Sequence, residues 1–204
     1  MTQQLILAST SPRRKELLLM LGIDLVVRPS HIPEIRASGE LPVEYSTRLA
    51  REKAARVAGD LVLGADTIVV LDEEILEKPE NERHALEILR RLQGRTHEVV
   101  TTVALRHDGG IRVATDITRV TFRPADDGML RQYIATGEPM DKAGAYGIQG
   151  YGATLIRRVE GDPFGVMGLP IRLVLELLEE AGFAYTFTAG LKRLPASPPT
   201  GLPG

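Results

Sequence analysis

One apolar run, residues 61–71, constrains the fold of this chain more than any other segment. It reads LVLGADTIVVL and is broken only by the tetrapeptide GADT at residues 64–67. A near-continuous apolar run of this length, rich in β-branched residues, is typical of a strand in the interior of a protein. The run therefore predicts a buried strand that carries one carboxylate, Asp66.

Other segments predict strands and helices that alternate along the chain. Apolar or alternating runs predict strands at residues 5–8, 96–106, 111–122, 153–160 and 183–188. Helix-start signals and periodicity predict helices beginning at Pro12, with Ser11 as the N-cap, at residues 42–57, after Asn81, and at residues 127–135 and 171–181. The sequence DGG at residues 108–110 predicts a hairpin. Alternation interrupted by one hairpin indicates an α/β fold with a mixed sheet.

The composition sets the class of protein. With 204 residues, 43% of them hydrophobic, the chain is long enough for one domain with a sizeable core. We expect that domain over residues 1–190, and disorder in a tail of residues 191–204, which is rich in proline and glycine.

Charge and cysteine content exclude several functions. A net charge of −2 argues against a nucleic-acid coat, which needs a basic excess. The chain has no cysteine, so it has no disulfide, thiolate nucleophile or cysteine-based metal site. No apolar stretch approaches the ~18 residues that cross a membrane, and the N-terminal charges follow the apolar run instead of preceding it, unlike a secretion signal. We expect a cytoplasmic protein that binds neither membranes nor nucleic acid.

Two segments of the chain place charged residues where local physics disfavours them. Arg13 and Arg14 lie in the first turn of the predicted helix, where cations oppose the helix dipole unless a polyanion such as phosphate is bound there. Ser9 adds a hydroxyl donor, although a solvated basic turn explains the same residues equally well. A carboxylate in a buried strand, such as Asp66, is costly unless a cation or hydrogen-bond donors satisfy it. This predicts that Asp66 is a metal ligand or a proton acceptor, and the alternative is that it only caps a turn.

Three further residues are ambiguous by themselves. Lys53 shares a helix face with apolar residues and either extends its amine to water or points it into a site. Lys78 precedes a proline and is also typical of a turn. Gln149 lies near the end of a glycine-rich stretch, residues 141–150, and its amide offers a donor and an acceptor that suit the edge of a nucleobase.

Together these segments match a known family. The matching strings are LASTSPRRKELL at residues 7–18, RLAREKA at 48–54, VLGADTIVV at 62–70, LEKP at 76–79, DKAGAYGIQG at 141–150 and GLP at 168–170. The chain resembles the Maf family of nucleoside triphosphate pyrophosphatases, in the branch that acts on dTTP and UTP. It departs from the family pattern at residues 161–167, GDPFGVM.

The resemblance implies an inosine-triphosphatase-like fold, a mixed twisted sheet with two lobes flanking a cleft. It implies hydrolysis of a nucleoside triphosphate to its monophosphate and pyrophosphate with Mg²⁺ or Mn²⁺, and the family suggests a homodimer. Carried over by motif position, Asp66 is the proton acceptor, and Glu34 and Asp66 are expected to hold the metal. Substrate binding and base specificity fall to Arg13, Thr67, Gln149, Ser9, Arg14, Lys53 and Lys78.

Two other functions stay open at this stage. The same chemistry could serve 7-methyl-GTP or a modified pyrimidine nucleotide, and a family member could act as a nucleotide-binding regulator of cell division and septum formation. An assay of pyrophosphate release distinguishes the enzymatic function from the regulatory one.

Overall fold

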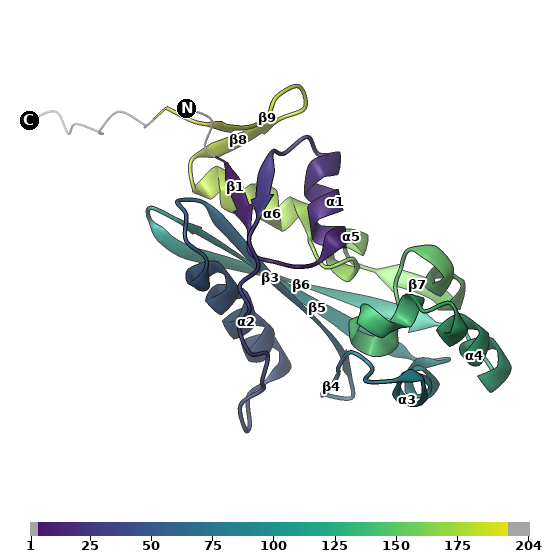
Figure 1. Cartoon of the computed structure of the whole chain (residues 1–204). Helices are drawn as coiled ribbons and strands as arrows, with labels where there is room; N and C mark the ends of the chain where they lie inside the picture. The colour runs from purple at the N-terminus through teal and green to yellow at the C-terminus, as the bar shows by residue number, and fades with distance from the viewer. Residues whose placement is uncertain (1–3, 196–204) are drawn as a thin grey trace, which may run out of the picture.

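The structure, a computed structural model, describes residues 4–195 and confirms the mixed α/β fold (Figure 1). Its main sheet has the strand order β2-β1-β3-β5-β6-β7, with β4 paired to the end of β3. The strands are β1 (Leu5–Leu7), β2 (Leu25–Val27), β3 (Val62–Leu71), β4 (Glu74–Leu76), β5 (Thr96–His107), β6 (Gly110–Phe122) and β7 (Ile156–Glu160). The pairs β1–β2 and β1–β3 are parallel, and the others are antiparallel.

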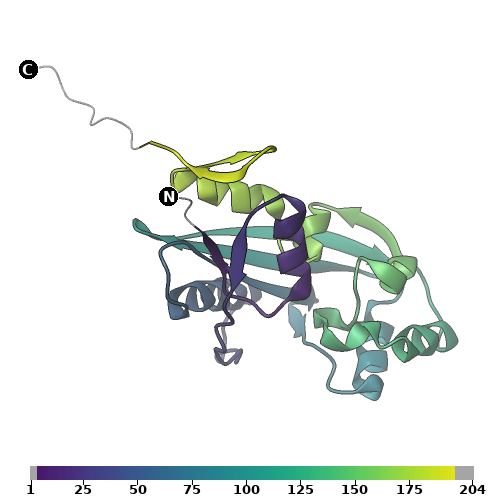
Figure 2. The same cartoon turned by 45° about the horizontal axis from the view of Figure 1, so that its top comes forward.

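Helices cover both faces of the sheet. They are α1 (Pro12–Met20), α2 (Pro42–Arg56), α3 (Glu82–Leu92), α4 (Asp127–Ala135), α5 (Pro163–Val166) and α6 (Ile171–Glu180). In Figure 2, α2 lies below the long strands, whereas α6 lies above them with the hairpin of β8 (Phe183–Thr186) and β9 (Gly190–Arg193). The helix α1 begins as predicted, with Pro12 in its first turn and Ser11 as the N-cap.

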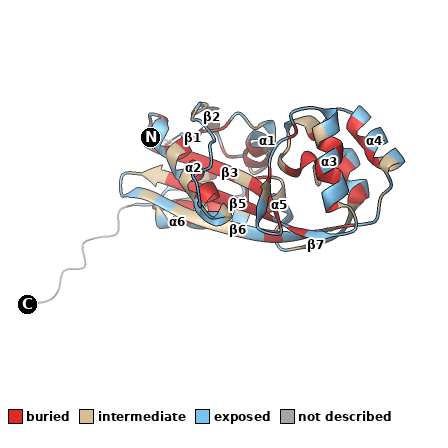
Figure 3. Ribbon diagram, turned by 90° about the horizontal axis from the view of Figure 1, so that it is seen from below, coloured by how far each residue is buried: buried red, intermediate tan, exposed pale blue. Residues whose placement is uncertain are grey.

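The strand β3 is buried on both faces, as its sequence predicts. Its odd-numbered residues Leu63 and Ala65 pack with α1 and α6, whereas Gly64 lies against the backbone of α2. Figure 3 shows the buried residues concentrated where the strands meet the inner faces of the helices. Because side chains alternate along a strand, consecutive residues of β3 face different helices.

Two hydrophobic clusters divide the molecule into lobes. One, the α1–α6 lobe, joins β1, α1, α6 and the adjacent strand ends. The other, the α3–α4 lobe, joins α3, α4 and the opposite ends of β3, β5 and β6. Between the lobes, one edge of β3 loses its partner: β1 pairs only as far as Leu63, and β4 pairs only from Val69 onward. Of the intervening residues, Asp66, Thr67 and Ile68 line the cleft between the lobes.

The structure differs from the sequence-based expectation in a few elements. Three short 3₁₀ helices lie in the glycine-rich stretch and on either side of it: η1 (Glu138–Asp141), η2 (Ala143–Ala145) and η3 (Gly150–Leu155). The predicted strand at 153–160 therefore begins later, at Ile156. The expected boundary of the tail at residue 191 is wrong, because residues 191–193 pair with β8 through backbone hydrogen bonds. Residues 196–204 of the predicted tail lie outside the described residues.

Within residues 4–195, no helix is both long enough and apolar enough to cross a membrane.

Candidate active site

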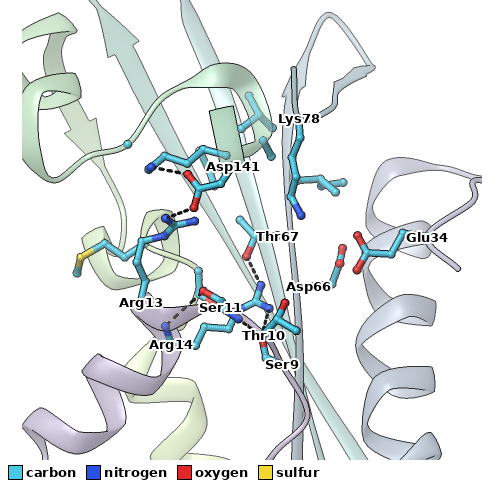
Figure 4. A pocket seen from close by; sticks show the side chains of 18 of the residues that line it. Ser9, Thr10, Ser11, Arg13, Arg14, Glu34, Asp66, Thr67, Lys78 and Asp141 are labelled. Atoms are coloured by element: carbon cyan, nitrogen blue, oxygen red, sulfur yellow. Dashed lines mark hydrogen bonds and ion pairs between the residues drawn. The ribbon is translucent and has the colours of Figure 1, made fainter. Parts of the chain in front are cut away.

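A cavity of about 720 Å³ lies in the cleft between the two lobes, beside the open edge of β3. All the residues that the sequence singles out for the site line this cavity: Ser9, Arg13, Arg14, Glu34, Lys53, Asp66, Thr67, Lys78 and Gln149. Figure 4 labels seven of them, which come from the loop before α1, from α1, from β3 and from segments on either side. The structure therefore brings together residues that are up to 140 positions apart in the sequence.

Lys53 and Asp66 form a buried ion pair on the floor of the cavity. The ammonium of Lys53 donates a hydrogen bond to Oδ1 of Asp66 at 2.8 Å, and it lies 2.6 Å from Oε1 of Glu34. The Lys53 side chain is only 9% exposed and that of Asp66 only 6%. Of the two alternatives for Lys53, the structure selects the one that points the amine into the site.

The second carboxylate oxygen of Asp66 has no hydrogen-bond partner within residues 4–195. Oδ2 is buried and accepts no hydrogen bond from any described residue. A buried carboxylate oxygen without a donor costs free energy, so this atom is suited to receive a proton or a cation from a ligand.

Two other carboxylates line the cavity near Asp66. Burial disfavours the charge of Glu34, but the hydrogen bond and the charge of Lys53 hold the pKa of Glu34 below its usual range. Burial raises the pKa of Glu77, and the negative charges of Asp66 and Glu34 raise it further. Glu77 was missed from the sequence, although it lies within the LEKP motif.

Arg14 is buried in the wall of the cavity and organises its neighbours. Its Nε donates to the carbonyl of Gly168 at 2.8 Å, and Nη1 donates to Ser9 Oγ at 3.1 Å and to the carbonyl of Ala65 at 2.9 Å. Nη2 donates to Thr67 Oγ1 at 2.9 Å. These bonds occupy four of the five N–H groups of a guanidinium, so Arg14 fixes the positions of Ser9 and Thr67.

The glycine-rich stretch is held in place by Glu138. Its carboxylate accepts hydrogen bonds from the backbone N–H of Tyr151 at 2.8 Å, the backbone N–H of Gly152 at 2.9 Å and the hydroxyl of Tyr133 at 3.0 Å. The same hydroxyl accepts from the backbone N–H of Gly147 at 3.2 Å. Exposed Gln149 therefore projects from a segment that is fastened on both sides.

A divalent cation fits this donor set. Mg²⁺ in nucleotide sites typically binds one or two carboxylates, the phosphates of the substrate and several waters. Asp66 offers an unpartnered oxygen and Glu34 a second carboxylate at the same floor. Within residues 4–195 there is no cluster of three or more acidic or histidine side chains arranged as a metal cage. The residues thus suit a cation that arrives with a polyphosphate.

The fold and the cavity define an α/β protein whose cleft combines cations, hydroxyls and a buried carboxylate, as a site for a phosphorylated ligand would. Residues 4–181 match the model of the family described as Maf-like protein. The chain is 50% identical over 182 residues to the "dTTP/UTP pyrophosphatase" of Koribacter versatilis, covering 87% of this chain and 94% of that one. It is 47% identical over 192 residues to the protein of the same name from Symbiobacterium thermophilum, covering 92% and 98%.

The chain therefore belongs to the Maf-like protein family. A crystal structure of a nucleoside-triphosphatase, also named dITP/XTP pyrophosphatase, from Mycobacterium abscessus aligns with 58% of this chain and 74% of its own, at a TM-score of 0.39 and 18% identity. That likeness is too slight to carry an argument about the site.

Proposed function

We propose that this protein hydrolyses dTTP and UTP to the nucleoside monophosphate and pyrophosphate. The observation that carries the proposal is Oδ2 of Asp66, which has no partner among the described residues and is buried at the floor of a cavity that Lys53 and Lys78 also line. The relatives that are about 50% identical over most of the chain bear the name of this activity, which supports the choice of substrate.

The chemistry follows from the arrangement around Asp66. A water attacks the α-phosphorus, the bond from that phosphorus to the bridging oxygen breaks, and pyrophosphate leaves. Asp66 accepts the proton that the attacking water loses, and a carboxylate positioned in this way contributes about 10²–10⁴-fold to the rate. Lys53 holds Asp66 in place through their 2.8 Å hydrogen bond.

In this proposal, cations and hydrogen-bond donors of the cavity bind the triphosphate. Lys78 is exposed and lines the cavity, where its ammonium can attract the phosphates as a flexible point charge. The loop at residues 9–11 and the start of α1 add hydroxyl and backbone donors, which favour anions. Glu34 and Asp66 would hold Mg²⁺ or Mn²⁺, and the bound ion would neutralise charge that develops on the phosphates.

Gln149 reads the base in this proposal. Thymine and uracil present O4 as an acceptor and N3–H as a donor, and one amide group matches both. Thr67, fixed by Arg14 and by the hydroxyl of Thr101 at 3.0 Å, completes the wall of the cavity between β3 and α1.

The test is pyrophosphate release from dTTP, UTP, CTP, GTP, 7-methyl-GTP and ITP, each with Mg²⁺ and with Mn²⁺. The control variant is Glu180→Gln, which removes an exposed carboxylate paired with Arg112. We expect dTTP and UTP to be the best substrates. Activity on 7-methyl-GTP alone would contradict the choice of base, and no release from any nucleotide would contradict the enzymatic function.

We also propose a cytoplasmic location and a homodimer, as the family resemblance implies. Light scattering coupled to size-exclusion chromatography tests the dimer, and a monomeric mass would contradict it.

A further inference from the structure

One ion pair joins the two lobes at the cavity. Nη1 of Arg13, in the first turn of α1, donates to Oδ2 of Asp141, the last residue of η1, at 3.1 Å. The Arg13 side chain is 27% exposed and that of Asp141 is 59% exposed. Figure 4 shows the two side chains reaching toward each other from opposite sides of the site. The guanidinium of Arg13 is thus drawn toward the glycine-rich stretch.

Asp141 is itself anchored to the segment that carries Gln149. Lys142 donates to Oδ1 of Asp141 at 2.6 Å, and its side chain lies against Gly147, where an added Cβ would come within 3.0 Å of Lys142 Cε. Burial disfavours the charge of Asp141, but Lys142 and Arg13 together hold the pKa of Asp141 below its usual range. Asp141 is therefore a fixed negative charge in the frame that Glu138 fastens.

The triphosphate and the carboxylate of Asp141 are two anions that compete for the guanidinium of Arg13. A triphosphate is the strongest anion that enters the cavity, and an unrestrained guanidinium beside it would turn to the phosphates. The carboxylate of Asp141 instead holds the guanidinium beside the segment that carries Gln149. Thymine and uracil carry two carbonyl acceptors, O2 and O4, whereas cytosine replaces O4 by an amine donor. A guanidinium has only donors, so it suits the carbonyl-rich bases.

We propose that Asp141 is a positioning residue for base specificity, which holds Arg13 where it and Gln149 contact the same base. This inference rests on the proposed function and deepens it. Asp141 itself does not touch the reacting phosphate, so its removal changes selectivity and binding more than the chemical step.

The experiment compares kcat and KM for dTTP and CTP in the wild type, Asp141→Asn, Asp141→Glu and Arg13→Gln, and in the double variant Arg13→Gln/Asp141→Asn. The matched control is again Glu180→Gln, because that carboxylate is 54% exposed and accepts from Arg112 at 3.0 Å, and neither residue lines the cavity. Melting temperatures establish that each variant is folded.

We expect Asp141→Asn to lower the ratio of kcat/KM for dTTP to that for CTP roughly fivefold, the upper range for a partly exposed ion pair. The loss should come from a higher KM for dTTP, and Asp141→Glu should restore most of it. In the Arg13→Gln background the second substitution should change nothing further, since Asp141 acts through Arg13.

Three results would overturn the proposal: an unchanged dTTP-to-CTP ratio in Asp141→Asn, an equal loss for both bases, or a full additional loss in the Arg13→Gln background. If Asp141→Asn does not fold, Arg13→Gln alone must reproduce the loss of selectivity, and unchanged selectivity there also refutes the idea. A wild-type protein that releases no pyrophosphate would instead refute the proposed function, so the two failures are distinguishable.

Discussion

Replacing Lys53 by methionine should destabilise the protein more than replacing its partner Asp66 by asparagine. Lys53→Met keeps the length of the side chain but removes the cation, so Asp66 keeps a negative charge that is 6% exposed. Its Oδ1 then loses the ammonium, and its Oδ2 already has no partner among the described residues. In Asp66→Asn, by contrast, Lys53 keeps its contact with Glu34 at 2.6 Å.

The magnitude follows from the geometry of the pair. Two unit charges 2.8 Å apart attract by about 6 kcal/mol at an effective dielectric constant of about 20. Part of that attraction offsets the cost of desolvating both groups, and breaking one side of a buried pair typically costs about 3–5 kcal/mol. Glu34 adds little, because it is 45% exposed and water can solvate it. We therefore expect a loss of about 3 kcal/mol for Lys53→Met and about 1 kcal/mol for Asp66→Asn.

Urea unfolding of the wild type, both single variants and the double variant measures these free energies. Lys53→Met/Asp66→Asn should be more stable than Lys53→Met alone, because the buried charge is gone, and yet it should remain inactive. A loss below about 1 kcal/mol in Lys53→Met, or a double variant that is less stable than Lys53→Met, would refute the argument that Asp66 is a buried charge stabilised by its ion pair with Lys53.

Three other predictions concern packing, pH and base recognition. Gly64→Ala would place a Cβ 2.4 Å from the backbone oxygen of Ala50. Because α2 and its lysine must then move, we expect the free energy of unfolding in urea to fall by about 2 kcal/mol and kcat to be lower. Wild-type values for both quantities would contradict the close packing. Burial lowers the pKa of His97 from 6.5 to about 4. Below pH 6.5 the unfolded chain therefore binds a proton at His97 that the folded protein does not, so the free energy of unfolding is fully retained above pH 6.5 and falls by about 3 kcal/mol as the pH falls to 4. Urea unfolding at both pH values should show a smaller loss in His97→Gln than in the wild type, and an equal loss would refute the assignment. Gln149→Glu presents only acceptors to O4 of the base, so kcat/KM for dTTP and UTP should fall at least tenfold; unchanged values would remove Gln149 from base recognition.

Helices and strands with strong local sequence signals could be predicted from the sequence, whereas strands with weak signals could not. The apolar run of β3, the hairpin between β5 and β6 and the proline at the start of α1 follow from short-range rules, and the structure confirms them. The strands β2 and β4 have three residues each, too few for any periodicity, and they exist because they pair with β1 and β3. Such strands depend on tertiary contacts.

The candidate site shows the same division. Asp66 is identifiable because a carboxylate contradicts its apolar surroundings, and Lys53 because it lies on an apolar helix face. Nothing local reveals that the donors of Arg14 are taken up by backbone carbonyls, or that Arg13 reaches an aspartate 128 positions away. Asp141 belongs to the DKAGAYGIQG motif, but nothing in that motif indicates its contact with Arg13, and Glu138 looks like an ordinary acidic residue of a loop. The roles of both residues therefore depend on the folded structure.

The central claim is that Asp66 accepts the proton from the water that attacks dTTP. The most direct measurement is the rate of pyrophosphate release from dTTP by Asp66→Asn and by the wild type, at saturating substrate and Mg²⁺, with circular dichroism to establish that the variant is folded. A positioned base is worth about 10²–10⁴-fold, so the account predicts a rate at least about a hundredfold lower in the folded variant. A folded Asp66→Asn protein that retains more than about a tenth of the wild-type rate would contradict it.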